Sequence, residues 1–459
     1  MIAKLLTIVF VGLGFVTAFC QSDRQLTISA QLRTRTELRD GQGTLAIRDT
    51  VPAFFTSQRS RINLGFSSHR LKLYTSIQDV RVWGQDASSI NRNNATGSDG
   101  FMVHEAWAEI SLIDTGKVVK NFTLKIGRQE LVYDDVRLLG NLDWLQQARR
   151  HDAAVLKFDH GGWTAHLGAA FNQNAERKSN TIYNGVPSGY AASTNGMSSM
   201  YKSLQFAYIA KKFSSATVSF LSVKDDFSRF HFAADDLDKK NPVYEQRVWS
   251  RITTGANAVG TLGKKLNVAA SAFYQGGRYR EGTSLDEYLL SLSAIYQAGK
   301  KYSTGAGVDI TSGNNGADAS RKFQRFDPLY GTPHKFWGHM DYFYVADGFG
   351  SNGLIDLYLK NKFHARENLF CTLDVHHFSL PGAVTDESGA TLTKTLGTEL
   401  DFIFNYGLTR QINFEAGYCT LFASPTLASP RVKNVPRADN LATWAYLMIA
   451  IKPEISFKH

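Results

Sequence analysis

Residues 288–311 read YLLSLSAIYQAGKKYSTGAGVDIT, and this stretch carries the pattern that decides the fold. Apolar residues occupy alternate positions at Tyr288, Leu290, Leu292, Ala294 and Tyr296, with Ser291 and Ser293 between them. After a short separator at 298–301, the alternation returns and continues to Thr311. Successive side chains of a β-strand point to opposite faces, so this period of two predicts an antiparallel hairpin with one apolar and one polar face.

The same alternation recurs from Leu26 onward, at 26–37, 59–66, 266–272, 399–405 and 412–418. The apolar faces are aliphatic and edged by Tyr and Phe, whereas the polar faces carry Arg, Glu, Asp or Asn. A sandwich of two sheets could also produce this pattern. A barrel with lipid outside and water inside explains it with a single rule, and the 12% aromatic residues suit its interfacial girdles. The sequence therefore predicts an all-β, transmembrane antiparallel β-barrel.

Two kinds of separator lie between the predicted strands. Short ones, such as 263–265 and 298–301, suit tight turns, and long polar ones suit extended loops: 88–100, 176–199, 225–244 and 313–332. A membrane barrel has this mixture, with short turns at one rim and long loops at the other. With strands of about 10 residues, the length allows roughly 16–20 strands in a single domain over residues 21–459.

The first twenty residues have the features of a secretory signal. Lys4 supplies the positive charge, an apolar run follows over 5–18, and Ala18 and Cys20 precede the expected cleavage site before Gln21. A lipoprotein signal acylated at Cys20 is the alternative, although Phe19 argues against it. The last alternating segment ends in Phe457, as in strands that the outer-membrane assembly machinery reads. We therefore expect export to the bacterial outer membrane.

Composition limits the chemistry that the chain can perform. Only Cys371 and Cys419 remain after the signal, without the spacing of a metal site, so no metal or cofactor is expected; a single disulfide stays open. The formal net charge of +10 favours anionic partners. The basic residues are not interleaved with stacking aromatics, which argues against nucleic acid.

One segment concentrates charge: residues 127–158, GRQELVYDDVRLLGNLDWLQQARRHDAAVLKF. It combines four arginines, at 128, 137, 149 and 150, with four aspartates, at 134, 135, 143 and 152. Guanidinium groups stay charged and present planar forks that match carboxylates. Surface ion pairs are the plain alternative. Within a barrel, the segment predicts a positively charged constriction that favours anions, polyuronates among them.

This segment resembles the alginate-export family of outer-membrane β-barrels, and two others support the likeness: FDPLYGTPHKFWGHMDYF at 326–343 and LGTELDFIFNYGLTRQINFEAGYCTLF at 396–422. The resemblance extends from about Gln25 to the end of the chain. It implies a monomeric barrel of about eighteen strands, with an electropositive lumen and constrictions carried by loops. It also implies passage of a polyuronate through the outer membrane.

The family resemblance, together with the strand face that each residue would occupy (its parity), identifies the candidate site residues. The predicted pathway and constriction consist of Arg137, Arg149, Arg128, Arg59, Arg61, Arg33 and Arg35. The predicted orienting partners are Asp135, Asp152, Asn141 and Trp144. The parity of Phe122, Leu124 and Ile126 would place Arg128 on the lipid side, unless Gly127 begins a bulge or the strand ends there.

The function expected from these features is passive diffusion of anionic saccharides, or other anionic solutes, through an arginine-lined lumen. The partners implied are outer-membrane lipid, the anionic solute and a periplasmic export or uptake partner. A general-solute porin and a structural or adhesive barrel are the alternatives. An enzyme is not expected: Asp374, Ser379 and either His376 or His377 can be assembled into a triad, but no GxSxG element supports it.

Overall fold

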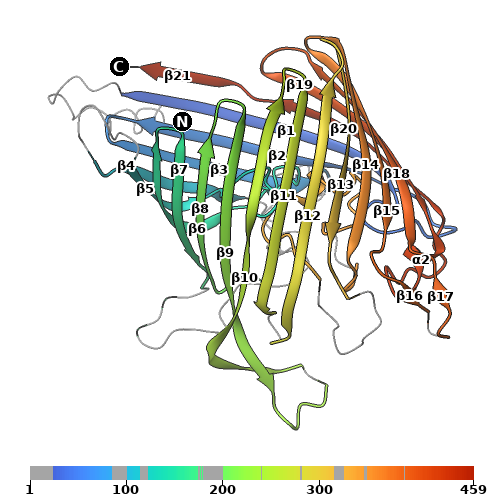
Figure 1. The fold of residues 1–459 in the computed structure, drawn as a ribbon. Helices are drawn as coiled ribbons and strands as arrows, with labels where there is room; N and C mark the ends of the chain where they lie inside the picture. The colour runs from blue at the N-terminus through green and yellow to red at the C-terminus, as the bar shows by residue number, and fades with distance from the viewer. Residues whose placement is uncertain are drawn as a thin grey trace.

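The computed structural model describes residues 24–84, 101–113, 122–173, 176, 178, 200–238, 240–279, 282–314, 325–345, 349–386 and 388–458. The expected signal, residues 1–20, lies outside them. One large sheet dominates the fold (Figure 1). Its strands are β1 Gln25–Asp40, β2 Ala53–Ser67, β3 Leu71–Val82, β4 Met102–Ser111, β5 Phe122–Gln129, β6 His151–His160, β7 Trp163–Phe171, β8 Ser203–Lys212, β9 Ala216–Phe232, β10 Pro242–Leu262, β11 Leu266–Arg278, β12 Ser284–Gln297, β13 Tyr302–Thr311, β14 Leu354–Arg366, β15 Leu369–Ser379, β18 Thr395–Gly407, β19 Ile412–Ala423, β20 Leu441–Ile451 and β21 Glu454–Lys458.

The smaller elements belong to the connections between strands. They are the ribbon of β16 Val384–Thr385 and β17 Thr391–Leu392, the 3-10 turn Pro333–Lys335 and the short helix α2 Pro425–Ala428. Within the described residues, no helix is long and apolar enough to span a membrane.

The sheet closes on itself. β1 pairs with β2 on one side and, on the other, with β20 through Leu32–Asp40 and with β21 through Gln25–Ser29. β20 and β21 thus occupy one strand position of the barrel, interrupted at Pro453, which cannot donate a ladder hydrogen bond. The nineteen strands form a closed antiparallel barrel with 18 strand positions, because β20 and β21 share one. This confirms the predicted fold class and strand number.

The two faces of the wall differ as the alternation predicts. Leu290, Leu292 and Leu357 point outward and are 45–58% exposed, which suits a surface that meets lipid. On the inner face Ser271 and Asn257 are buried, and the Ser271 hydroxyl donates to Asn257 Oδ1 over 2.7 Å. Closure leaves no open sheet edge to expose unpaired backbone groups.

Tight turns such as 263–265 and 298–301 lie at one rim, and long connections such as 41–52 and 130–150 lie at the other. The segment 225–244, expected as a long loop, is a correction to this scheme. β9 continues to Phe232 and β10 begins at Pro242. Phe230 lies opposite Tyr244 in the register, with their ring centroids 5.9 Å apart. The extended hairpin projects from the barrel (Figure 1). Cross-strand aromatic contacts explain why the ladder persists there.

Two long connections fold into the barrel, and we call them the inner loops: residues 130–150, between β5 and β6, and residues 325–345, between β13 and β14. They pair with each other through a parallel bridge between Leu139 and Tyr330. Gly140 N donates to Tyr330 O over 2.9 Å, and Thr332 N donates to Val136 O over 2.8 Å. The apolar core of the protein therefore lies inside the barrel, where Leu139, Phe326, Met340 and Tyr342 are 0% exposed.

Gly331 allows the close approach of the inner loops. A Cβ atom there would lie 2.0 Å from the carbonyl oxygen of Arg137 on the other loop. Any other residue would push the loops apart, so this glycine is a requirement of the packing.

The two remaining cysteines lie on opposite faces of the wall. Cys371 shares the outward parity of Leu373, which is 43% exposed, whereas Cys419 is fully buried on the lumenal face. Both are free thiols. Side chains on opposite faces of a sheet cannot reach disulfide distance without moving the backbone.

We expect both cysteines to remain thiols in the exported protein. Labelling with a maleimide under denaturing conditions without reductant should add two labels per chain by mass spectrometry, and Cys371→Ser should take one. A chain that accepts no label until it is reduced would contradict the assigned strand faces.

Candidate functional site

Four lumenal arginines on β1 and β2 form a patch that we call the arginine wall: Arg33, Arg35, Arg59 and Arg61. Arg33 lies directly opposite Arg59 in the strand register. Like charges that face each other across a strand pair destabilise it. The wall therefore needs a counter-charge, which the first inner loop supplies.

Asp143 provides that counter-charge. Its carboxylate lies 2.8 Å from Arg59, 3.4 Å from Arg33 and 3.7 Å from Arg61. Burial acts to raise the pKa of Asp143, but Arg59 and Arg33 together hold it below its usual range. One carboxylate thus bridges three guanidinium groups from two strands.

The wall also binds the backbone of residues 143–147, which we call the anchor segment. Arg33 donates to the carbonyl oxygens of Asp143 over 2.7 Å and Leu145 over 3.0 Å, and Arg35 donates to that of Trp144 over 2.9 Å. Leu142 and Ala148, on either side, have positive φ angles of 49° and 53°. The irregular backbone leaves carbonyls unpaired, and the forked guanidinium donors satisfy them.

Arg137 attaches the first inner loop to the far wall. Its guanidinium lies 2.6 Å from Asp309 on β13 and 3.2 Å from Asp135, and it stacks 3.9 Å above the Phe336 ring of the second inner loop. Although burial alone would lower it, the pKa of Arg137 is raised by Asp309 and Asp135. Arg137 is buried and fully engaged within the protein.

Arg149 joins the two inner loops. It is buried and donates to the carbonyl oxygen of Gly331. Burial lowers the pKa of Arg149 to about 10. Trp144 also joins the two loops, since it stacks on His334 at 4.2 Å. Asn141 acts within the first inner loop, where it donates to Glu130 over 2.9 Å.

Arg128 is a correction to the predicted site. It lies on the same outward face of β5 as Ile126. It forms a bidentate ion pair with Asp152, also on the outer face, at 2.8 and 2.9 Å. The strand ends at Gln129, so this pair lies at the rim. Arg128 and Asp152 therefore do not join the lumenal arginines.

A second buried network was missed from the sequence. Arg251 on β10 lies 2.6 Å from Asp225, its register partner on β9, and 2.8 Å from Asp327 of the second inner loop. The hydroxyl of Tyr330 donates to Asp225 over 2.9 Å. The assignment of 225–244 to a loop concealed Asp225, and with it the partner of Arg251.

Lysines keep more contact with water than the buried arginines. Lys335 is exposed on the second inner loop, where it donates to the Asp135 carbonyl over 3.0 Å. The Lys360 side chain is 31% exposed and lies 2.8 Å from Asp374. Lys335 interacts with Arg137, whose charge lowers the pKa of Lys335 after the larger effect of partial burial.

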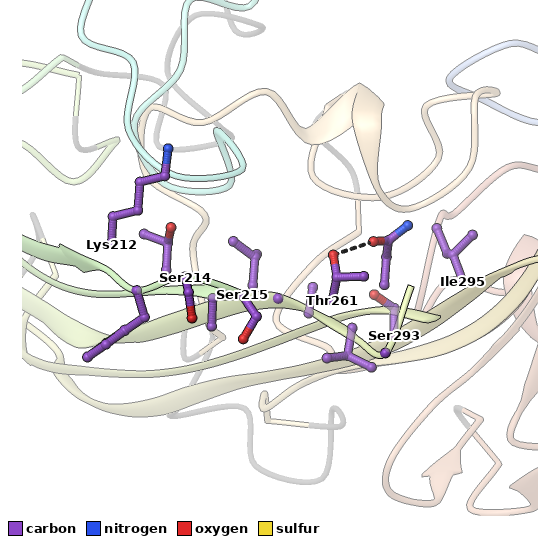
Figure 2. Close-up of a pocket in the computed structure, with 15 residues that line it drawn as sticks. Lys212, Ser214, Ser215, Thr261, Ser293 and Ile295 are labelled. Carbon is purple, nitrogen blue, oxygen red and sulfur yellow. Dashed lines mark hydrogen bonds between the residues drawn. The ribbon is translucent and has the colours of Figure 1, made fainter. Parts of the chain in front are cut away.

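A hollow of about 610 Å³ lies at the short-turn rim beside β9 to β12 (Figure 2). Its polar lining is small and neutral apart from Lys212, with Ser215, Thr261 and Ser293 among its residues. Thr261 donates to Asn267 over 2.8 Å, as the dashed line in Figure 2 marks. The lining of this hollow carries far less charge than the arginine wall.

Comparison with known proteins places these features in a family and a fold. The alginate export family matches residues 24–431. Among curated proteins, none matches the sequence.

Solved structures share the architecture at low identity. OccAB4 of Acinetobacter baumannii has a TM-score of 0.60 and 11% identity over 95% of this chain and 99% of its own. OccK9 (OpdG) of Pseudomonas aeruginosa has a TM-score of 0.59 and 12% identity over 94% and 98%. Pseudomonas aeruginosa OpdK with vanillate has a TM-score of 0.56 and 10% identity over 94% and 99%.

Replacing Asp143 should loosen the anchor segment. In Asp143→Asn the guanidinium groups lose their shared counter-charge, which should cost about 1–3 kcal/mol of local stability. Hydrogen exchange should then show faster exchange of amides 143–147, and single-channel conductance should rise as the loop leaves the lumen. Asp152→Asn, which removes an arginine partner on the outer face, is the matched control. Equal exchange of the anchor segment in both variants would contradict the assignment.

Acid should have the same effect on the wild-type chain. Because the pKa of Asp143 is depressed in the folded protein, its stabilising contribution is present above the unfolded value of about 4 and is lost as pH falls through the lower folded value. Amide exchange in 143–147, corrected for intrinsic rates, should therefore rise on acidification in the wild type and stay flat in Asp143→Asn. A matching rise in Asp143→Asn would assign the effect to another group.

Proposed function

The chain belongs to the alginate export family, and from this premise we propose that it is an outer-membrane channel passing anionic saccharides, or other anionic solutes, by passive diffusion. The arginine wall is the observation that carries the proposal. Its four guanidinium groups, with Arg39, face two carboxylates, Asp143 and Glu37. The excess positive charge, surrounded by low-dielectric protein, raises the local concentration of anions in the lumen.

We assign two roles to the cations: some hold the inner loops, and others contact the solute. Arg33, Arg35, Arg59, Arg137 and Arg149 hold the inner loops and supply the field. Arg61, whose side chain is 12% exposed, and Lys335, which is exposed, meet the solute. Conduction needs contacts weak enough to release each carboxylate, and cations already balanced by protein acceptors meet that need.

The proposed transport is not enzymatic and uses no cofactor, and the chain acts as a monomer in lipid. The geometry of the histidine pair supports the non-enzymatic part of this proposal. His376 is buried in the lumen, 2.9 Å from Asp356, whereas the neighbouring His377 points outward and contacts Thr398 over 3.0 Å. Adjacent strand residues on opposite faces cannot act on one substrate.

A pore for small carboxylates is the second candidate. One of the similar barrels is known with vanillate, an aromatic carboxylate. The hollow in Figure 2 is compact and mostly neutral, which suits a small solute more than a chain of charges.

Neutralising the two cations proposed to meet the solute should reduce anion preference. In planar bilayers under a salt gradient, the wild-type reversal potential should indicate anion selectivity. Arg61→Gln with Lys335→Gln should lower the anion-to-cation permeability ratio by about twofold per charge removed. The anchors Arg33 and Arg59 are unchanged, so the inner loops should keep their position and the effect should report the lost charge.

The control for this experiment is Lys300→Gln with Lys301→Gln. It removes the same charge from the exposed turn between β12 and β13. It should leave the permeability ratio unchanged. Cation selectivity of the wild type, or an equal loss in both double variants, would refute the proposal.

A further inference from the structure

Three metal-ligating side chains meet where the second inner loop contacts the barrel wall. They are His339 of the loop, Asp401 on β18 and Cys419 on β19, and one ligand atom from each lies within 4.8 Å of the others. Asp401 and Cys419 are direct partners in the strand register. Glu399 precedes Asp401 by two residues and shares its face.

The groups on the barrel wall are buried and His339 is partly buried, and several of their polar atoms have no hydrogen-bond partner. Asp401 and Glu399 are both 0% exposed. Asp401 Oδ2 accepts from the backbone N–H of His339 over 3.2 Å, and Glu399 Oε1 accepts from that of Met340 over 2.8 Å. Asp401 Oδ1, Glu399 Oε2 and His339 Nδ1 have no hydrogen-bond partner.

The charge of the two carboxylates also lacks an ion-pair partner. In the part of the chain that the structure describes, neither Asp401 nor Glu399 forms a salt bridge with a lysine, arginine or histidine, although Lys360 pairs with nearby Asp374. Two adjacent buried carboxylates without a counter-ion are strongly unfavourable. Either a proton or a cation must therefore neutralise the pair.

We propose that His339, Asp401 and Cys419 bind a zinc-class divalent ion, with Glu399 as the fourth ligand or its immediate neighbour. Thiolate, imidazole and carboxylate together are a zinc ligand set. Ligands about 2.0–2.3 Å from zinc lie about 3.3–3.8 Å from one another in a tetrahedron. The cluster needs only a modest contraction to reach that geometry. On binding, the Cys419 thiol releases its proton to solvent.

The bound ion would fix the second inner loop to the wall. Gly338, with φ of 79°, lets the loop approach so closely that a Cβ atom there would lie 2.5 Å from Glu399 Oε1. The ring of His339 stacks on His334 at 5.1 Å, and His334 stacks on Trp144 of the anchor segment. The ion would thus stabilise the same loop assembly as the arginine wall, whatever solute the channel conducts.

Metal content tests the site directly. The full chain, refolded in detergent with Zn²⁺ and freed of unbound metal, should contain one zinc per chain by mass spectrometry. Cys371→Ser, which removes the outward thiol, should retain it. Cys419→Ser and Asp401→Asn should bind zinc at least about tenfold more weakly. A wild-type chain that binds no zinc above the level of Cys419→Ser would overturn the proposal and leave a shared proton between Glu399 and Asp401.

Cobalt provides a readout that does not depend on the folding of Cys419→Ser or Asp401→Asn. Wild-type protein and Cys371→Ser loaded with Co²⁺ should both show the near-ultraviolet charge-transfer band of a thiolate–cobalt bond. Bound cobalt without that band would overturn the assignment of Cys419 as a ligand, even if Cys419→Ser failed to fold.

Discussion

The contact between Asp143 and the arginine wall is the interaction on which the interior of this barrel depends. A closed barrel of 18 strand positions encloses a lumen wider than its wall side chains fill, and here two long connections turn into it. The wall binds the carboxylate and the carbonyls of residues 143–147, and the first inner loop then provides the edge on which the second loop pairs at Tyr330. Buried ion pairs are weak sources of net stability, but a pair broken on one side is costly. The network therefore specifies where the loops sit more than how stable the barrel is.

This arrangement changes what the arginines do for transport. A guanidinium that donates to backbone carbonyls and to Asp143 is already balanced, so it acts on a passing anion mainly through its field. The side chains that retain water, Arg61 and Lys335, are then the ones available for direct contact. A lumen organised in this way attracts anions without holding them tightly, which is what a channel requires.

The sequence predicted the barrel well because the alternation is local. The alternation within each strand identifies its apolar and its polar face. Its repetition from Leu26 onward favours a barrel over other all-β architectures. Parity also identified the lumenal side of Arg33, Arg35, Arg59 and Arg61, and it raised the doubt about Arg128 that the outer ion pair with Asp152 resolves.

The interior could not be predicted in the same way, because its contacts join segments far apart in the chain. Arg137 meets Asp309, and Arg33 meets Gln146, across more than a hundred residues. No spacing rule connects His339 with Asp401 and Cys419, so the expectation of no metal site rested on local motifs alone. The irregular backbone of the inner loops carries no periodic signal that would show them folding inward.

The most direct test of the central claim, a channel for anionic saccharides, is current block by a polyuronate. Single wild-type channels in a planar bilayer would be exposed to a polyuronate on one side and then to a neutral polysaccharide of the same length. We predict voltage-dependent block by the polyuronate alone, relieved as salt screens the charges. Equal block by both polymers, or none by the polyuronate in a conducting channel, would contradict it.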